Sequence, residues 1–95
     1  MRTLKFAWDE KKNRINQRKH GVTFEEAQTV FFDETAIEYF DPEHSKNENR
    51  FILLGMSIRL RVIIVCYCYR EDDSVIRIIS VRKATKKERK IYPGG

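Results

Sequence analysis

Residues 60–70 have the sequence LRVIIVCYCYR, an almost unbroken apolar run in a chain that is 35% charged. The run is rich in β-branched and aromatic residues, and it is far shorter than the ~18 apolar residues that a membrane-spanning helix needs. Alternate side chains separate into two faces, with Val62, Ile64, Cys66 and Cys68 on one and Arg61, Ile63, Val65, Tyr67 and Tyr69 on the other. Because both faces are apolar, we predict that this segment is the central strand of a sheet.

The flanking segments supply partners for this strand. Alternating patterns predict strands at residues 35–41, 50–57 and 75–83, and a short first strand at residues 2–8. Residues 71–74, Glu-Asp-Asp-Ser, predict a tight turn before the last strand, and residues 42–49 predict a polar loop. Short connections of this kind join antiparallel neighbours, so the last four strands should form a meander.

Two helices are predicted between the first two strands. Asp9 is a suitable N-cap for a charged helix that ends at His20, where Gly21 follows as the expected C-terminal residue. Thr23 and Glu26 have the spacing of a capping box, with Val22 and Ala27 as its hydrophobic staple. The buried face of this second helix should contain Phe24, Ala27, Val30 and Phe31.

The first helix has Ile15 as its main apolar residue and should therefore lie at the rim. Thr85 and Glu88 form a second capping-box pattern, which predicts a C-terminal helix that buries Ile91 only lightly. Together these elements predict an α+β fold: an antiparallel sheet of four to five strands with two N-terminal helices and a C-terminal helix, the helices mainly on one face. We expect one domain over residues 1–95.

Length and composition exclude several classes of protein. A chain of 95 residues cannot hold a nucleotide-binding domain and a separate substrate domain, so any site should be a surface groove. The start MRTLKF turns highly charged instead of continuing as the apolar run of a signal peptide, which predicts a cytoplasmic protein without a membrane segment. The only interior glycines are Gly21 and Gly55, so a Gly-rich phosphate loop is excluded.

The cysteines and histidines match no common metal motif. Cys66 and Cys68 are two residues apart on one strand and do not face each other, so we predict core thiols and no disulfide. Combined with His20 and His44 they do not have the spacing of a zinc site, and we predict no metal and no cofactor. His44 lies in the polar loop, where nothing in the surrounding sequence suggests a role.

The net charge of +5 is unevenly distributed. Residues 1–21 carry seven Lys/Arg and two acidic residues, residues 22–45 carry seven acidic residues and no Lys/Arg, and residues 46–95 carry twelve Lys/Arg and five acidic residues. Basic ends favour a polyanion such as nucleic acid, and the acidic middle favours a different, basic partner. Solvated charged faces are the alternative interpretation of the same pattern.

The densest basic cluster surrounds the end of the last strand. Lysines in the first turn of a helix oppose the helix dipole unless an anion lies there, so a phosphate would fit the start of the C-terminal helix. An exposed helix with solvated lysines is the alternative. The predicted RNA-binding residues are Arg77, Lys83, Lys86, Lys87 and Arg89, with Arg82 and Lys90 in the same cluster.

A second group of arginines should lie near the first on the sheet. Arg50 lies on one predicted strand, Arg61 on the neighbouring one and Arg59 just before the latter, and forked guanidinium donors match phosphate oxygens. Such a cluster can stabilise the charge that develops in phosphoryl transfer. His20 is a candidate general acid or base, or alternatively a residue that stabilises the end of its helix.

With these residues in view, the chain resembles the BrnT toxin family, the RelE-like ribonuclease half of a bacterial type II toxin–antitoxin pair. Its N-terminal match is Phe6-Ala7-Trp8-Asp9-Glu10, Lys12, Asn16, Lys19-His20-Gly21-Val22, Phe24 and Glu26-Ala27. The remaining match is Arg50-Phe51, Gly55, Arg77-Ile78-Ile79-Ser80-Val81-Arg82, Ala84, Glu88-Arg89 and Tyr92. Val81 replaces the small residue expected before the arginine of the motif.

The resemblance implies a RelE-like fold and RNA cleavage that inhibits translation. It implies a BrnA-like antitoxin that covers the toxin and carries the DNA-binding segment, so that operator DNA is contacted only through the antitoxin. The RNA substrate is either free or associated with the ribosome. By position, the catalytic candidates are His20, Arg50, Arg59, Arg61 and Arg82, acting without a metal.

Three hypotheses are therefore open. The first is a metal-independent endoribonuclease in which a ribose 2′-OH attacks the adjacent phosphate. The second is a non-catalytic basic module that binds RNA or protein. The third is an interaction subunit that acts only in a complex and uses the acidic segment from Glu25 to Glu43 as its contact surface.

Overall fold

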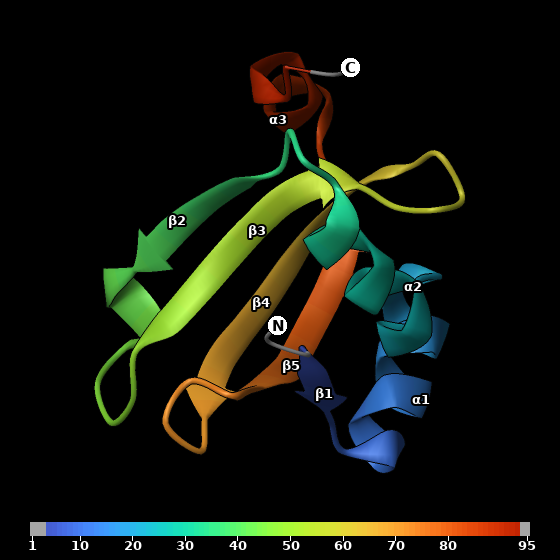
Figure 1. Ribbon diagram of the computed structural model, residues 1–95. Coiled ribbons are helices and arrows are strands. Elements are labelled where there is room, and N and C mark those ends of the chain that lie inside the picture. Colours follow the sequence, from blue (N-terminus) through green and yellow to red (C-terminus); the bar gives the residue numbers. More distant parts are fainter. Residues whose placement is uncertain (1–3, 94–95) are drawn as a thin grey trace.

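The computed structural model describes residues 4–93 and contains a five-stranded sheet in the order β1-β5-β4-β3-β2 (Figure 1). The strands are β1 (Lys5–Ala7), β2 (Ile37–Asp41), β3 (Arg50–Met56), β4 (Val62–Arg70) and β5 (Val75–Lys83). The helices are α1 (Glu10–His20), α2 (Phe24–Thr29) and α3 (Lys86–Ile91), with 3-10 turns η1 (Val30–Phe32) and η2 (Pro42–His44). No helix within these residues is long and apolar enough to cross a membrane.

The central position of β4 and the meander around it are confirmed. β2, β3, β4 and β5 pair in sequence as antiparallel neighbours, and the turn between β4 and β5 lies where it was predicted. The edge strand β1 departs from the predicted antiparallel sheet, because its residues Lys5, Phe6 and Ala7 pair with β5 in parallel. No hairpin joins β1 to β5, so the local sequence does not set their relative direction. Residues 2 and 3 of the predicted first strand lie outside the described residues.

The two faces of β4 contribute to two separate clusters, as the alternation predicts. Ile63, Val65 and Tyr67 belong to the main core, together with Phe24, Ala27 and Val30 of the α2–η1 segment. On the opposite face Ile64 packs with Leu54, Ala84 and Tyr92 in a smaller cluster. We call this second side the open face. It is the side on which the fold leaves polar groups accessible, as described below.

A β-bulge reverses the alternation of β5. Cys66 of β4 is opposite Ser80, whereas the next residue, Tyr67, is opposite Ile78, so Ile79 is the extra residue in β5. Ile78 and Val81 therefore both reach the main core, although they are three residues apart. Strict alternation from Ile78 would have directed Arg82 into that core. The bulge instead aligns Arg82 with Ile64 on the open face.

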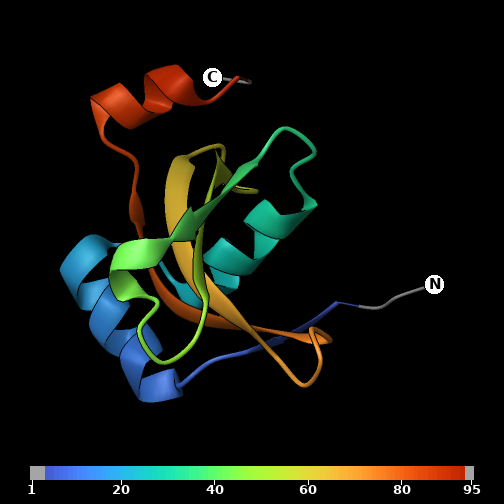
Figure 2. The same ribbon diagram turned by 90° about the vertical axis from the view of Figure 1, so that its left-hand side faces the viewer.

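The helices are distributed over both sides of the sheet, which corrects the expectation that they lie mainly on one face. Figure 2 shows α2 on one side of the sheet, with α1 and α3 toward the other. α2 supplies the apolar residues that cover the main core, whereas α1 lies along β5 and buries Asn13 and Asn16. The prediction that α1 lies at the rim is confirmed. A helix without an apolar face gains no hydrophobic stabilisation from covering a core.

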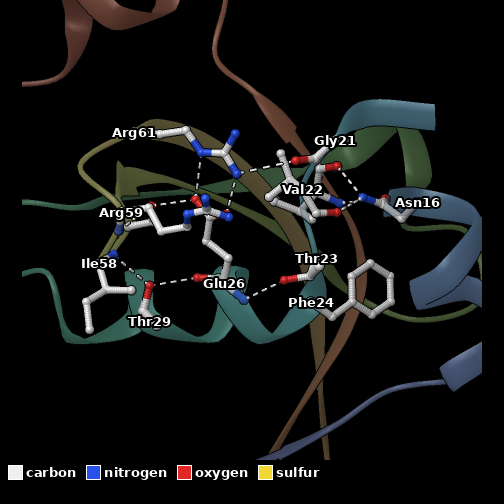
Figure 3. Close-up of polar contacts among 12 residues, drawn as sticks. Asn16, Gly21, Val22, Thr23, Phe24, Glu26, Thr29, Ile58, Arg59 and Arg61 are labelled. Atoms are coloured by element: carbon white, nitrogen blue, oxygen red, sulfur yellow. Dashed lines mark hydrogen bonds and ion pairs between the residues drawn. The ribbon is translucent and has the colours of Figure 1, made fainter. Parts of the chain in front are cut away.

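Asn16 attaches α1 to the edge of β5. Its Nδ2 donates to the carbonyl oxygens of Val81 (2.8 Å) and Val22 (2.9 Å), and its Oδ1 accepts from Val81 N (3.0 Å). The bond to Val22 is drawn in Figure 3. Because β1 pairs only with the start of β5, the backbone at Val81 would otherwise be an unpaired edge. One buried amide thus satisfies both polar groups of Val81 and fixes the turn after α1.

The C-terminal helix α3 is held by two carboxylates. Thr85 and Glu88 form the predicted capping box, and Glu88 also binds Arg82 through both of its oxygens, at 2.8 and 2.9 Å. After the helix, the Tyr92 hydroxyl donates to Asp33 Oδ2 at 2.6 Å. Ile91 is exposed, as expected, so α3 depends largely on these polar contacts and on the burial of Ala84 and Tyr92.

We predict that Asn16→Ala lowers the free energy of unfolding by about 2–4 kcal/mol, because it leaves two buried carbonyls and one amide of the backbone without partners. Urea unfolding followed by far-UV circular dichroism measures this loss. Gln17→Ala is the matched control, since Gln17 is the exposed next residue of the same helix. Equal stability of the two variants would contradict the role assigned to Asn16.

Acidification is predicted to release α3. Hydrogen bonds from Arg82 lower the pKa of Glu88 from 4.5 to about 2, and the pKa of Asp33 is also lowered, since hydrogen bonds from Met56 N, Tyr92 and Thr35 outweigh its burial. Because the folded pKa of Glu88 is the lower one, its contribution is complete above pH 4.5 and is lost as the pH falls toward 2.

Hydrogen exchange of the α3 amides between pH 5 and pH 2, corrected for the intrinsic exchange rate, measures this release. Glu88→Gln should already exchange faster at pH 5 and should show a smaller change with pH. If amide protection of α3 fell equally with pH in the wild-type protein and in Glu88→Gln, the ion pair between Glu88 and Arg82 would not be the contact that holds α3.

Candidate functional site

A groove of about 290 Å³ lies on the open face, between the β2–β3 connection and the end of β5. Its apolar floor contains Ile52, Ile64 and Cys66 of the two middle strands. Polar side chains stand at its borders, and two of them are arginines that are far apart in sequence. The polar lining residues are Asp41, His44, Arg50, Ser80 and Arg82.

A second groove adjoins the first along β5. It is lined by Lys12, Lys19 and His20 of α1, and Ile79 and Ser80 line both grooves. The bulge places these two consecutive residues at the boundary, and the attachment of α1 through Asn16 brings the basic side of the helix to it. The open face therefore carries a polar track from α1 across β5 to the β2–β3 connection.

Arg82 enters the groove with its guanidinium already oriented. Nη1 and Nη2 bind the two carboxylate oxygens of Glu88, and Nη1 also donates to the carbonyl of Lys83 at 3.3 Å. The hydrogen bonds that Arg82 donates to Glu88 raise the pKa of Arg82 above its ordinary value. The arginine is thus permanently charged, and its side chain remains 42% exposed on the side away from Glu88.

Arg50 is held more loosely. Its Nε lies 3.5 Å from Glu48 Oε1, and among residues 4–93 this buried nitrogen has no hydrogen-bond partner. Glu48 is shared with Arg70, whose Nη2 lies 2.9 Å from its other oxygen. The Arg50 side chain is nevertheless 36% exposed, so the exposed part of its guanidinium can still bind an anion, whereas both amino groups of Arg82 are already bound to Glu88.

Arg61 and Arg59 are not brought to this groove. Arg61 belongs to the other face, where it binds Glu26 through Nε (3.0 Å) and Nη2 and donates to the carbonyl of Gly21 at 3.3 Å (Figure 3). Arg59 lies in the β3–β4 turn near the same carboxylate, whose charge it helps to stabilise. Of the five predicted catalytic residues, the structure gathers Arg50 and Arg82 in one groove and His20 in the adjoining one.

Because Glu26 binds Arg61, the capping box predicted for α2 is only half formed. Thr23 Oγ1 accepts from Glu26 N at 3.1 Å, as a capping box requires, but the Glu26 carboxylate does not return to Thr23. It binds Arg61 and accepts from the Ser57 hydroxyl at 2.6 Å. Burial by itself would raise the pKa of Glu26, but these hydrogen bonds prevail and the pKa is lowered.

The predicted RNA-binding residues are more dispersed than the sequence suggests. Lys83, Lys86 and Lys87 are exposed, but Lys83 is opposite Ile63 and therefore lies on the main-core side of β5, not on the open face. Arg89 donates to the carbonyl of Ala84 at 3.2 Å. Arg77 is five residues before Arg82 in β5, roughly 16 Å away along the strand. Its positive charge stabilises the ionised carboxylate of Asp9 at the start of α1. A phosphate is not required at the start of α3, because Glu88 already places a negative charge in its first turn.

Most of the acidic segment serves internal contacts. Glu26 binds Arg61, Asp33 binds Tyr92, Glu38 accepts from the hydroxyls of Tyr67 and Tyr69, and Asp41 binds His44. These four carboxylates are partly or wholly committed to the fold. Glu25 also accepts from Asn13 Nδ2 at 2.7 Å, so the acidic contact surface that the charge pattern suggested is reduced mainly to Glu34 and Glu43, which are exposed.

His44 is the functional candidate that the sequence analysis left without a role. Its Nδ1 lies 2.8 Å from Asp41 Oδ2, and both residues line the groove that contains Arg50 and Arg82. The available signal was the spacing Asp41-Pro42-Glu43-His44, since a turn started by proline brings residues i and i+3 together. That spacing has meaning only once the turn is known to border the groove.

Asp41, Glu43 and His44 are also the residues in the described part that are best placed to hold a metal ion. Their ligand atoms lie within 4.8 Å of one another. However, Asp41 Oδ2 is hydrogen-bonded to His44 Nδ1, so a metal bound through these two atoms would displace that contact. The geometry favours a hydrogen-bonded pair over a chelating site.

Known proteins provide the remaining evidence. A family model described as "Ribonuclease toxin, BrnT, of type II toxin-antitoxin system" matches residues 8–88. The crystal structure of the Brucella abortus ribonuclease toxin BrnT superimposes with a TM-score of 0.65 at 26% sequence identity, covering 88% of this chain and 100% of that one. Comparison with curated protein sequences gives no match. The resemblance noted in the sequence is thus confirmed, and the chain belongs to the BrnT family of ribonuclease toxins of type II toxin–antitoxin systems.

Proposed function

We propose that this chain is an endoribonuclease that cleaves RNA on the open face by attack of a ribose 2′-OH on the adjacent phosphate, without a metal. The observation that carries the proposal is that Arg50 and Arg82, from two different strands, line one groove. Two guanidinium groups at a phosphate supply the positive charge that a metal ion supplies in other nucleases. Membership of a ribonuclease toxin family supports the same activity.

The geometry suggests a role for each part of the track. The exposed part of the Arg50 guanidinium would bind the phosphate oxygens, while Arg82, oriented by Glu88, would face the charge that develops during attack. Lys12 and Lys19 of α1, and Lys86 and Lys87 of the helix that follows Arg82, would contact phosphates of the flanking nucleotides, whereas Lys83 extends from the other face of β5. Arg77 lies apart and would contribute only to the wider positive field.

We further propose that the cleaved RNA is needed for translation, so that the activity stops growth, and that a BrnA-like antitoxin neutralises it by covering the toxin. A type II toxin has a protein antitoxin by definition of the system, which supports the partner. Binding of operator DNA would be a property of the antitoxin. The exposed Glu34 and Glu43 remain available for a basic segment of that partner.

The nature of the RNA ends tests the reaction. Purified protein should cleave a single-stranded RNA in the presence of EDTA and leave 2′,3′-cyclic phosphate and 5′-hydroxyl ends, as measured by mass spectrometry. Arg82→Lys keeps the charge but not the fork, and we expect it to reduce the cleavage rate by a factor of about 100 or more. The same variant should relieve growth inhibition on expression.

Arg59→Ala is the matched control, because Arg59 is an arginine of the same predicted group that lies outside the groove. It should cleave at the wild-type rate. Strong salt-dependent RNA binding with the RNA left intact would instead identify a non-catalytic binding module. Cleavage that requires a divalent ion would contradict the metal-independent mechanism.

A further inference from the structure

We propose that His44, held by Asp41, is the general base of RNA cleavage in the groove. This inference rests on the ribonuclease function proposed above and assigns its proton transfer to one atom. His44 stands at the border of the same groove as Arg50 and Arg82, whereas His20 lines the adjoining one. A residue that activates the attacking hydroxyl must lie beside the phosphate that the arginines bind.

The contact with Asp41 determines which nitrogen of the ring is free. An ionised carboxylate can only accept, so the 2.8 Å contact between Asp41 Oδ2 and His44 Nδ1 makes Nδ1 the donor. In the neutral ring Nε2 then carries the lone pair and is the atom able to take a proton. Asp41 is buried while the His44 side chain is 63% exposed, so the anchored nitrogen faces the protein and the ring remains accessible to RNA.

The turn that carries His44 is braced from both strands. Asp41 is paired with Arg50 across β2 and β3, and the Ser45 hydroxyl donates to the carbonyl of Asp41 and accepts from Arg50 N at 2.9 Å. Pro42 opens the 3-10 turn and restricts its backbone. His44 and Arg50 are therefore fixed relative to each other by the same hydrogen bonds, which is what a base and a phosphate-binding residue require.

His20 has no comparable arrangement. It occupies the last turn of α1, and in the part of the chain that the structure describes no hydrogen bond orients its ring. Its position beside Lys12 and Lys19 suits binding of a neighbouring phosphate, or stabilisation of the helix end. The structure thus separates the two histidines, one oriented inside the arginine groove and one unoriented next to it.

The chemical step balances as a transesterification. His44 Nε2 takes the proton of the 2′-OH, and the 2′-oxygen forms a bond to phosphorus. The bond between phosphorus and the 5′-oxygen breaks, and that oxygen leaves as a hydroxyl after taking a proton from water. The His44 imidazolium, stabilised by the Asp41 carboxylate, then returns its proton to solvent. The products are a 2′,3′-cyclic phosphate and a 5′-hydroxyl.

Single-turnover cleavage of a short single-stranded RNA by the full chain tests the assignment. His44→Gln should lower the rate by a factor of about 100 or more, and Asp41→Asn by about tenfold or more, because the ring loses its orientation and its stabilised charged form. His20→Gln should reduce the rate less than His44→Gln. Arg59→Ala serves again as the control that keeps the wild-type rate.

Two readouts separate catalysis from a structural role. Between pH 5 and 8 the wild-type rate should rise as a base is deprotonated, and this rise should be absent from His44→Gln. Added imidazole should restore cleavage to His44→Ala and not to Arg82→Lys. A merely structural histidine would give neither result, and thermal unfolding of each variant verifies that it is folded.

The outcomes distinguish this inference from the function on which it rests. If the wild-type protein cleaves RNA and His44→Gln retains its rate within about twofold, the assignment of His44 is overturned and the ribonuclease proposal stands. If His44→Gln is slow but its residual rate still rises between pH 5 and 8, and imidazole fails to rescue His44→Ala, the assignment is also overturned. If the wild-type protein leaves RNA intact, both proposals fall.

Discussion

The free backbone edge of β5 at Val81 is the point on which the arrangement of this protein depends. Asn16 closes that edge with two hydrogen bonds to Val81 and makes a third to the carbonyl of Val22, and so fixes α1 against the sheet. The bulge at Ile79, two residues earlier, turns Arg82 toward the open face. One short segment of β5 thereby brings the basic side of a helix and an oriented arginine to the same surface. A helix with almost no apolar residues is placed by an amide rather than by a core.

The role of each charged residue depends more on its contacts in the fold than on the sequence segment to which it belongs. Carboxylates of the acidic middle orient other groups: Glu26 binds Arg61, and Asp41 binds His44. Glu88 does the same for Arg82 from a basic segment. Beside the groove that holds Arg50 and Arg82, the adjoining one is lined by Lys12 and Lys19. The fold of this BrnT family member therefore uses acidic residues to position basic ones at a surface where an RNA phosphate would bind.

Patterns of short range predicted much of the fold. The boundaries of β5, the turn before it, the cap of α1 at Asp9 and the capping box of α3 all involve residues a few positions apart, and they are observed as expected. The site was predicted less completely. Arg50, Arg82 and His20 were identified from their chemistry, whereas Arg61 was assigned to the wrong surroundings because its carboxylate partner is 35 residues away. His44, the base that we propose, was left without a role because its groove is lined by residues of four strands and a turn.

The sequence by itself thus determined the elements, the central strand, the family and the basic character of the surface, since each follows from periodicity, from caps or from a pattern of side chains along the chain. Only the tertiary structure decided the direction of β1, the side of the sheet on which each helix lies, and which carboxylate meets which cation. Those choices depend on pairing between strands that no turn joins and on a one-residue bulge that exchanges the faces of β5. A single inserted residue reverses every later side chain of a strand, so alternation alone cannot tell which arginine reaches the groove.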